Sequence, residues 1–282
     1  MTQAIKNLVN AVIRGTLGLL RASAAGRYIV DQIIRAIVNS TTTVRHRETD
    51  LTFVVPNRVN RLRAVTFSTK EPETLAWIDQ IPEGAMLWDV GANVGLYTCY
   101  AAKARRCQVC AFEPSVFNLE VLARNIHLNR LTERVTIVPL PLSDGRGVST
   151  LNMTTTEWGG AFSTFGQAYG HDGQPLRTTF EFRTAGFAMS DAAGLLGLRQ
   201  PQYIKMDVDG IEHLILKGGG DVLRQVTGVL IEVNEEFETQ ARDCARYLTE
   251  AGLVLAEKRH ADMFEHSIFK NTYNQIWQRP AR

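Results

Sequence analysis

The spacing of hydrophobic positions changes near residue 84. Between residues 4 and 38, apolar side chains recur at three- and four-residue steps, which is the period of an amphipathic helix. Gly26 lies inside this stretch and predicts a break between two helices. After residue 84, short apolar runs alternate with helical patterns. This alternation predicts a mostly parallel sheet with helices on both of its faces.

Seven apolar segments are predicted to be strands, and the last two are expected to form an antiparallel pair. The expected strands are 86–90, 107–112, 135–142, 203–208, 228–234, 253–258 and 274–279. The fold class is therefore α/β, with a doubly wound, mostly parallel seven-stranded sheet and an N-terminal helical extension. We expect the extension to be residues 1–50 and the domain to be residues 51–282. Residues 152–186 have little periodicity and are expected to form a long loop, with room for one hairpin.

Composition sets few limits on function. The chain has 282 residues, of which 45% are hydrophobic, and a net charge of +2, as in an ordinary globular protein. This charge gives no indication of a nucleic-acid partner. The extension prefers Arg and Lys, so its helices can lie on a membrane surface or pack on protein, and packing is the commoner fate. Arg14, Arg21 and Arg27 interrupt any run long enough to span a membrane.

Cys107 and Cys110 have the CxxC spacing of many metal sites, but they fall inside an expected strand. Residues three apart on a strand face opposite sides, and no second CxxC completes a zinc site. We interpret them as small core residues with reduced thiols, in a cytoplasmic setting.

The sharpest chemical signal is Asp89-Val-Gly-Ala-Asn-Val-Gly95, between an expected strand and an expected helix. Glycines let a ligand approach the backbone, and the helix N-terminus offers N–H groups to an anion. Glu113 ends the next strand, 113 − 91 = 22 residues after Gly91, where a carboxylate can accept both hydroxyls of a ribose. A dinucleotide loop needs glycine where Asn93 stands, so the motif favours S-adenosylmethionine, which has no pyrophosphate.

A second cluster follows the fourth expected strand. Lys205, Asp207 and Asp209 alternate and therefore share one face at the strand's carboxyl end, where open α/β sheets bind ligands. Methyl transfer to oxygen requires an aligned acceptor and a group that removes or shares its proton. Asp207 or Asp209 could do this. The structural alternative is that these charges cap the next helix or orient each other.

Metal and histidine chemistry are weaker alternatives. Glu232 and Asn234 end the adjacent strand, and with Asp207 and Asp209 they could hold Mg²⁺. A metal site would need these four side chains to point toward one another, and the alternation along the strands does not establish that. We therefore expect no metal. His213, expected on a helix exterior, and His260 and His266, in the last loop, are lesser candidates for a general base. The aromatic and glycine-rich run 158–165 is either a lid over the acceptor or a packed loop.

These motifs together resemble the FkbM-type methyltransferases, class I S-adenosylmethionine-dependent enzymes that mostly methylate hydroxyl groups. The resemblance covers about residues 50 to 279. It is carried by EPETLAWID (71–79), WDVGANVGLYT (88–98), FEPSVFNLEVLARNIHLN (112–129), LSD (142–144), YIKMDVDGIEHLILKG (203–218) and TYNQIW (272–277). It implies the Rossmann-like class I fold. It further implies that the donor is bound by Asp89, Gly91, Asn93, Gly95 and Glu113, with Ser143 and Asp144 beside the adenine.

The resulting hypothesis is an S-adenosylmethionine-dependent O-methyltransferase that acts on a hydroxyl of a sugar, glycolipid or secondary metabolite. Its expected catalytic residues are Asp207, Asp209 and Lys205. The strand end Asp-Val-Asp-Gly lacks the Asn/Asp-Pro-Pro-aromatic motif of enzymes that methylate exocyclic amines, so nucleic acid is not expected as a partner.

Two other functions fit the sequence less well. An NAD(P)-dependent oxidoreductase is disfavoured by Asn93 and by the missing Tyr-x-x-x-Lys pair. A non-enzymatic membrane-surface adaptor is disfavoured by the intact Asp89, Glu113 and Asp207. The expected partner is a small-molecule or glycan acceptor, and peripheral membrane contact through residues 4–38 and oligomerisation stay open.

Overall fold

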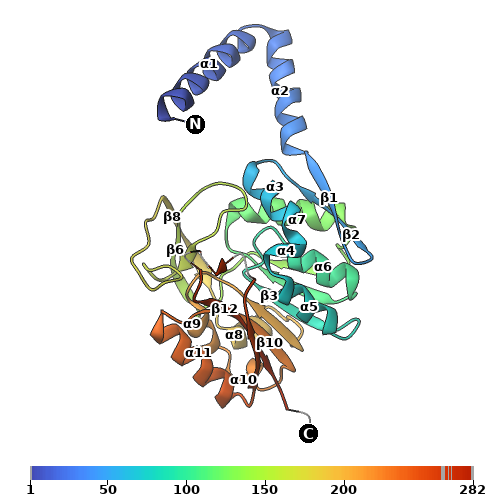
Figure 1. Cartoon of the computed structure of the whole chain (residues 1–282), viewed down its shortest axis with the longest axis vertical. Coiled ribbons are helices and arrows are strands. Elements are labelled where there is room, and N and C mark those ends of the chain that lie inside the picture. Colours follow the sequence, from blue (N-terminus) through green and yellow to red (C-terminus); the bar gives the residue numbers. More distant parts are fainter. Residues whose placement is uncertain (1, 262–263, 266, 268, 281–282) are drawn as a thin grey trace.

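The computed structural model of the chain describes residues 2–261, 264–265, 267 and 269–280. Its centre is a seven-stranded sheet in the order β11-β12-β10-β9-β3-β4-β5, in which only β12 runs antiparallel to its neighbours (Figure 1). The strands are β3 (Met86–Val90), β4 (Gln108–Phe112), β5 (Val135–Val138), β9 (Tyr203–Met206), β10 (Gly228–Asn234), β11 (Val254–Arg259) and β12 (Thr272–Gln278). The predicted α/β class, strand number and closing antiparallel pair are confirmed.

Helices cover both faces of this sheet. One face packs against α5 (Pro72–Gln80), α6 (Leu96–Ala104) and α7 (Val116–Leu128). The other packs against α8 (Met189–Leu195), α9 (Glu212–Lys217), α10 (Gly220–Leu223) and α11 (Glu238–Glu250). Alternation along β3 divides its side chains between the two cores: Leu87 lies on the first side and Trp88 on the second.

Cys107 and Cys110 also divide between these two cores. Both are buried free thiols, Cys107 in the cluster beneath α5–α7 and Cys110 in the cluster beneath α8–α11. Because they lie on opposite faces of the sheet, their interpretation as core residues is confirmed.

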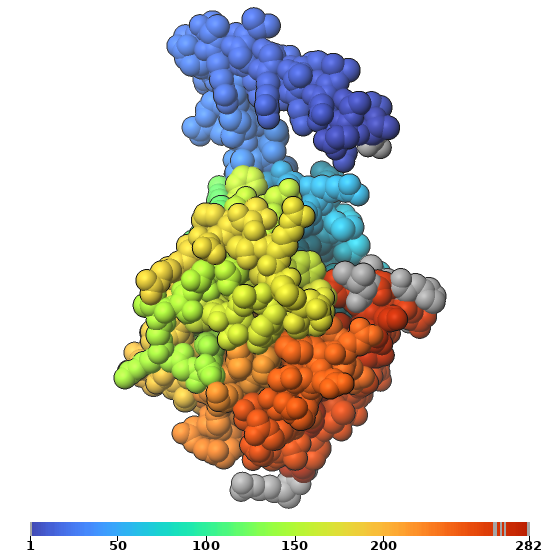
Figure 2. Space-filling view, turned by 90° about the vertical axis from the view of Figure 1, so that its left-hand side faces the viewer, coloured from blue at the N-terminus to red at the C-terminus, as the bar shows by residue number. Residues whose placement is uncertain are grey.

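The N-terminal residues form α1 (Gln3–Arg21) and α2 (Ala24–Val38), which project from the body of the molecule (Figures 1 and 2). The break between them lies at Ala22 and Ser23, so its prediction at Gly26 is wrong. Ser23 caps α2 by accepting a hydrogen bond from the Gly26 N–H at 3.0 Å. Gly26 instead serves close packing, since an added Cβ would lie 1.8 Å from the Leu20 carbonyl oxygen.

A hairpin of β1 (Thr41–His46) and β2 (Thr49–Val54) joins these helices to the domain. Two helix asparagines hold β2, since Asn125 and Asn129 accept the backbone N–H groups of Val54 and Thr52. The helices α3 (Arg58–Val65) and α4 (Phe67–Lys70) follow. The expected domain boundary near residue 50 therefore falls inside a hairpin.

Residues 147–186 contain more structure than the expected long loop. β6 (Gly147–Met153) pairs antiparallel with β7 (Ser163–Phe165) on one side and β8 (Phe180–Gly186) on the other. This small sheet lies beside the carboxyl ends of the main strands (Figure 1). In the described part of the chain, no helix is both long and apolar enough to cross a bilayer.

Candidate functional site

The glycine loop connects β3 to α6 with a tight backbone. Gly91, Asn93 and Gly95 all have left-handed φ values, of 84°, 50° and 82°. An added Cβ at Gly91 would lie 1.8 Å from the Asp207 carbonyl oxygen, so only glycine fits there. The loop therefore brings its backbone directly against the segment that follows β9.

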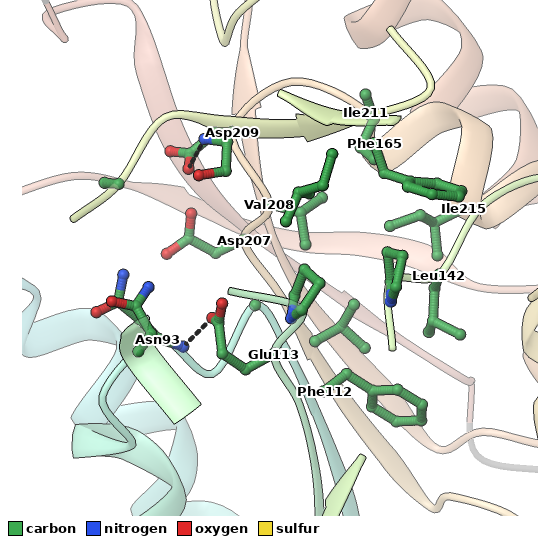
Figure 3. Close-up of a pocket in the computed structure, with 18 of the residues that line it drawn as sticks. Asn93, Phe112, Glu113, Leu142, Phe165, Asp207, Val208, Asp209, Ile211 and Ile215 are labelled. Atoms are coloured by element: carbon green, nitrogen blue, oxygen red, sulfur yellow. Dashed lines mark hydrogen bonds between the residues drawn. The ribbon is translucent and has the colours of Figure 1, made fainter. Parts of the chain in front are cut away.

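Glu113 lies at the end of β4, facing this loop (Figure 3). Its Oε2 accepts the Asn93 N–H and its Oε1 accepts the Ser115 N–H, both at 2.8 Å. Burial raises the pKa of this carboxyl to about 7, although both hydrogen bonds oppose the rise. Each of the two carboxylate oxygens keeps one free lone pair. In the ionised form, Glu113 can therefore also accept hydrogen bonds from the hydroxyl groups of a bound sugar.

A cavity opens between the loop, Glu113 and the small sheet. Its walls are mainly apolar, with polar groups at one end from Asn93, Glu113 and Asp207 (Figure 3). The apolar walls come from Phe112, Leu140, Leu142, Leu151, Phe165, Ile211 and Ile215. The lining, apolar with an acidic group at one end, suits the base and ribose of a nucleoside, although the volume of about 60 Å³ is smaller than a whole nucleoside occupies.

Ser143 and Asp144 directly follow this wall without lining it. Asp144 forms an exposed ion pair with Lys217, at 2.9 Å, and the hydrogen bond from Lys217 lowers the pKa of Asp144. Their expected position beside an adenine stays a prediction.

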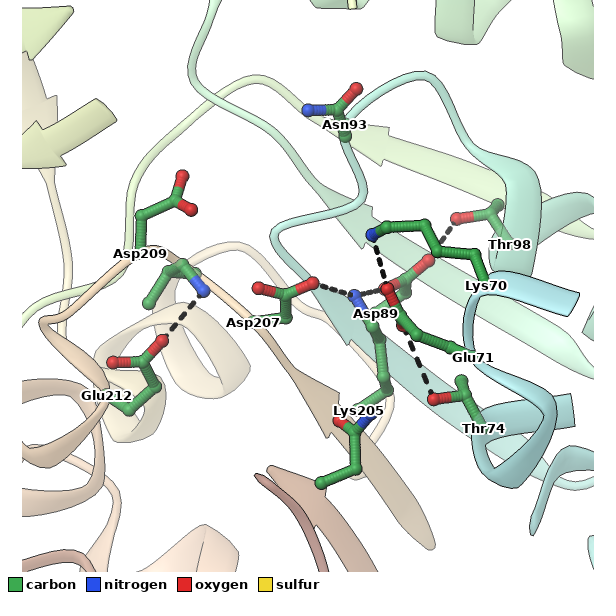
Figure 4. A network of polar contacts seen from close by, with 12 residues as sticks. Lys70, Glu71, Thr74, Asp89, Asn93, Thr98, Lys205, Asp207, Asp209 and Glu212 are labelled. Carbon is green, nitrogen blue, oxygen red and sulfur yellow. Dashed lines mark hydrogen bonds and ion pairs between the residues drawn. The ribbon is translucent and has the colours of Figure 1, made fainter. Parts of the chain in front are cut away.

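A buried network of charges lies below the loop. β3 and β9 pair so that Asp89 stands directly opposite Lys205. The Lys205 Nζ lies 3.6 Å from Asp89 Oδ1 and 3.4 Å from Asp207 Oδ2 (Figure 4). Burial alone would lower the pKa of Lys205, but Asp207 and Asp89 raise it, so the ammonium stays charged. Lys205 therefore holds Asp207 in place rather than serving as a base.

Asp89 is more deeply buried than a residue in direct contact with the donor would need to be. Its Oδ2 accepts the Thr98 hydroxyl at 2.5 Å, whereas its buried Oδ1 has no hydrogen-bond partner. Asp89 lines neither of the two cavities of the site. A direct bond from Asp89 to a ligand stays a prediction.

Asp209 and Asp207 have different surroundings. Asp209 has a left-handed φ of 62°, and its Oδ2 accepts the N–H groups of Phe162 and Ser163 at 2.6 and 3.3 Å. Burial, and then the charge of Asp207, raise the pKa of Asp209 to about 6. Asp207 is tied only to Lys205 and faces the open site. Of the two carboxylates that line both cavities, Asp207 is the one without a hydrogen bond to the backbone.

Neither aspartate caps the helix that follows. α9 begins at Glu212 after Ile211, with no side-chain cap. The Glu212 carboxylate, which belongs to the same cluster in the sequence, instead accepts the N–H groups of Val208 and Gly210 at 2.9 and 3.1 Å (Figure 4). The capping interpretation is wrong, since Glu212 binds N–H groups of the loop before α9, whereas the ion pair between Lys205 and Asp207 agrees with charges that orient each other.

A second cavity of about 600 Å³ adjoins the first. The two share a boundary of five residues, Gly91, Asn93, Ala161, Asp207 and Asp209. The charged residues that line the second cavity are the cations Arg58, Arg63 and Lys70 and the acids Glu73, Asp207, Asp209 and Glu232. Two ligands bound in these cavities would meet beside Asp207.

The run 158–165 forms the partition between the cavities. The Asn93 side chain donates to the Gly160 carbonyl at 2.8 Å, and Asn118 accepts the Gly159 N–H at 2.9 Å. These hydrogen bonds, together with those that Asp209 accepts from the N–H groups of Phe162 and Ser163, hold the run in place. It is an ordered wall of both cavities.

The expected alternative metal ligands do not converge. Asn234 donates its amide to the His171 carbonyl and accepts the Glu236 N–H, so it is occupied away from Asp207. Burial, and then Asp207, raise the pKa of Glu232 well above its usual value. Within the described ranges, no group of three or more His, Cys, Asp or Glu side chains is arranged to hold a metal ion.

Of the two candidate histidines that the structure describes, His213 lies elsewhere than expected. His213 is buried, not on the exterior, because α11 covers α9 and the Phe237 ring packs on it at 5.7 Å. His260 stacks on Tyr273 and lines the second cavity. His266 lies outside the described residues.

A buried glutamate before α5, Glu71, and the half-buried Lys70 beside it form an ion pair that the sequence did not predict. Lys70 donates to Glu71 at 2.5 Å, and Glu71 also binds Thr74 and the phenol of Tyr97 (Figure 4). The charge of Lys70 acts on Asp207 across the cavity. The sequence feature that could have identified this ion pair is Glu-Pro at the start of a helix. Glu and Pro are common at exposed helix starts, however, so this feature does not by itself indicate a buried site.

Comparison with known proteins gives consistent matches. The family model described as the methyltransferase FkbM domain matches residues 89–255, more than half of the chain. Over 177 residues the chain is 26% identical to the hexuronic acid methyltransferase AglP of Haloferax volcanii, covering 62% of this chain and 66% of that protein. The chain therefore spans just under two thirds of this curated relative.

Two solved structures show similarity at low identity. The methyltransferase FkbM from Methylobacillus flagellatus KT has a TM-score of 0.49 and 15% identity, covering 71% of this chain and 44% of that one. M. jannaschii TYW2, in complex with AdoMet, has a TM-score of 0.44 and 13% identity, covering 86% of this chain and 88% of that one.

Proposed function

The chain belongs to the FkbM methyltransferase family, and on that premise we propose that it transfers a methyl group from S-adenosylmethionine to a hydroxyl oxygen of a sugar. The observation that carries the proposal is the meeting of two cavities at Asp207. One suits a nucleoside, and the other is wide enough for a saccharide unit.

The residues of the first cavity fit the donor. Glu113 would accept the ribose hydroxyls, and Phe112, Leu140 and Leu142 would cover the adenine. The absence of a Cβ at Gly91 lets the loop pack against the Asp207 carbonyl, which sets the position of the loop beside the cavity. Bound S-adenosylmethionine supplies an activated methyl group, so the protein needs only to align the acceptor and handle one proton.

Asp207 is the proposed base. Its carboxylate faces the second cavity, and the ion pair with Lys205, at 3.4 Å, fixes its orientation. The acceptor hydroxyl would donate to Asp207 while its oxygen faces the first cavity. Its proton would pass to Asp207 as the oxygen–methyl bond forms and the sulfur–methyl bond of the donor breaks, with adenosylhomocysteine as the leaving group. Asp209 would contribute by holding the partition, through its bonds to the Phe162 and Ser163 N–H groups.

Two guanidinium groups of the second cavity, on Arg58 and Arg63, could bind an acidic sugar, while the carboxylates Glu73, Asp207, Asp209 and Glu232 line other parts of the same cavity. Arg58 has no ion-pair partner among the described residues, and Arg63 donates one N–H to a carbonyl, Gly159 O, leaving its other donors for a ligand. Guanidinium groups bind carboxylates in a bidentate manner. The relative from Haloferax volcanii is named for a hexuronic acid, which agrees with this choice.

We also propose that residues 51–282 carry catalysis, that residues 1–50 serve another role, and that the protein acts in the cytoplasm. The support for the last point is that all four cysteines are free and buried.

The test is turnover with matched acceptors. The purified chain would be incubated with S-adenosylmethionine and either a uronic acid glycoside or the corresponding neutral glycoside. We expect release of adenosylhomocysteine, a mass gain of one methylene unit, and a lower KM for the acidic sugar. Arg58→Gln should remove this difference in KM. Tight binding of NAD, with no binding of adenosylhomocysteine, would contradict the proposal and favour the oxidoreductase.

A further inference from the structure

The exposed apolar surface of the protein is concentrated on α1 and α2. These helices carry eleven of the 21 large hydrophobic side chains that are exposed in the described residues. The eleven are Ile5, Leu8, Val9, Val12, Ile13, Leu19, Tyr28, Ile29, Ile33, Ile34 and Ile37. None of the residues of α1 is buried, so the described part of the chain leaves this surface uncovered. Figure 2 shows the two helices, in blue, standing clear of the body.

The apolar side chains of α1 form one face of the helix. At 100° per residue, Ile5, Leu8, Val9, Val12 and Ile13 lie on one side. Asn7, Asn10 and Arg14 lie on the opposite side by the same geometry. Exposed polar and apolar faces of this kind need a partner with both a polar and an apolar layer.

The charge of this pair of helices selects the partner. Lys6, Arg14 and Arg21 lie on α1, which has no acidic residue, and Arg27 and Arg35 lie on α2. The one carboxylate, Asp31, is paired with Arg35 at 2.7 Å. Five basic residues against one acidic residue give 5 − 1 = +4. A second copy would bring two such charges together, whereas anionic lipid headgroups neutralise them.

We propose that α1 and α2 bind the interface of an anionic lipid bilayer. The apolar face enters the boundary between headgroups and acyl chains, and the basic side chains remain among the headgroups. The base of α2 is attached to the domain, since Arg124 on α7 donates to the Asn39 side chain at 2.8 Å. The hairpin that follows packs against α3, and Arg58 and Leu62 of α3 line the second cavity. Membrane binding therefore holds the acceptor cavity near the headgroups.

The experiment is vesicle flotation of the full chain with phosphatidylcholine alone and with added phosphatidylglycerol. The test variant Leu8→Ser/Val12→Ser removes two apolar side chains. Its control, Asn7→Ser/Asn10→Ser, makes the same number of changes on the opposite face. Arg14→Gln/Arg21→Gln tests the charge. Because α1 buries nothing, all three variants should keep the wild-type melting temperature.

We expect wild type to bind the phosphatidylglycerol vesicles and to lose affinity as salt is added. Leu8→Ser/Val12→Ser should bind at least about tenfold more weakly, and the asparagine control should match wild type. Each removed arginine should weaken binding by about fivefold.

The proposal fails if wild type ignores both vesicles, binds them equally, or is unaffected by Leu8→Ser/Val12→Ser. It also fails if light scattering shows a dimer that this variant dissociates while vesicle binding is absent, since the partner is then a second copy. No donor or acceptor is present in these assays, so the result is independent of the proposed catalysis.

Discussion

Donor binding should depend on the ionisation of Glu113. Burial raises its pKa to about 7, so the free protein near neutral pH holds this side chain in both forms. The protonated carboxyl loses acceptor capacity, whereas the carboxylate can accept ribose hydroxyls alongside the N–H groups of Asn93 and Ser115. The affinity for adenosylhomocysteine should therefore rise as the pH rises through about 7.

The magnitude follows from the pKa. If only the carboxylate binds, each pH unit below about 7 lowers the affinity about tenfold, or about 1.4 kcal/mol. Glu113→Gln removes the charge and directs an amide N–H₂ at one of the two backbone N–H groups. Losing two charge-assisted hydrogen bonds should cost about 2–4 kcal/mol, which is roughly 30- to 900-fold in affinity. The variant should show no pH dependence of its own.

The same shift has the opposite effect on stability. A carboxyl whose pKa is raised by folding, here from 4.5 to about 7, contributes stability that is fully present below about pH 4.5. That contribution is lost as the pH rises through about 7. The melting temperature of the free wild-type protein should fall across this window relative to Glu113→Gln, while its donor affinity increases.

Calorimetry with adenosylhomocysteine at about pH 6, 7 and 8 tests this directly. Glu83→Gln is the matched control, because Glu83 is a surface carboxylate, paired with Arg106, outside the lining of both cavities. A flat affinity for wild type would refute the reasoning. A pH dependence that survives in Glu113→Gln would assign it to Glu212 or Asp209, whose pKa values burial raises to about 7 and about 6.

Three other changes test the rest of the site. Asp207→Asn should lower kcat by about 10²–10⁴ with little change in donor affinity or melting temperature; full turnover would exclude a catalytic role. Turnover should survive EDTA, because Asn234 is bonded to the His171 carbonyl and not to a shared ion site; loss of turnover that Mg²⁺ restores would contradict this. Gly91→Ala should lower the melting temperature and abolish donor binding in calorimetry, because its Cβ would collide with Asp207 O. Gly15→Ala, in open space on α1, is the control and should leave both unchanged.

The parallel core was predictable because buried strands are short, apolar and punctuated by glycines. The strands 86–90 and 228–234 have the predicted bounds. β5 ends early, at Val138, because Pro139 and Pro141 lack the N–H that a sheet ladder needs. The small sheet was missed because much of β6 and β8 is exposed or half-buried, so neither strand has a clear alternation of its own.

The glycine loop, Glu113 and Asp207 could be located from the sequence because each directly follows a predicted strand. Their partners could not. The pairing of Asp89 with Lys205 depends on the register between β3 and β9, which are more than a hundred residues apart. The burial of His213 depends on α11 covering a helix only six residues long.

The partition formed by residues 158–165 links the shape of the donor cavity to that of the acceptor cavity, two properties that evolution would otherwise adjust separately. Asn93 and Asn118, which line the first cavity, bond this segment, while its Phe162 faces the second. A substitution here that reshapes the second cavity also disturbs the wall of the first. Homologues that exchange one sugar for another should therefore carry compensating changes at positions 93 and 118, and chimaeras that swap the partition alone should lose donor affinity until those positions are swapped as well.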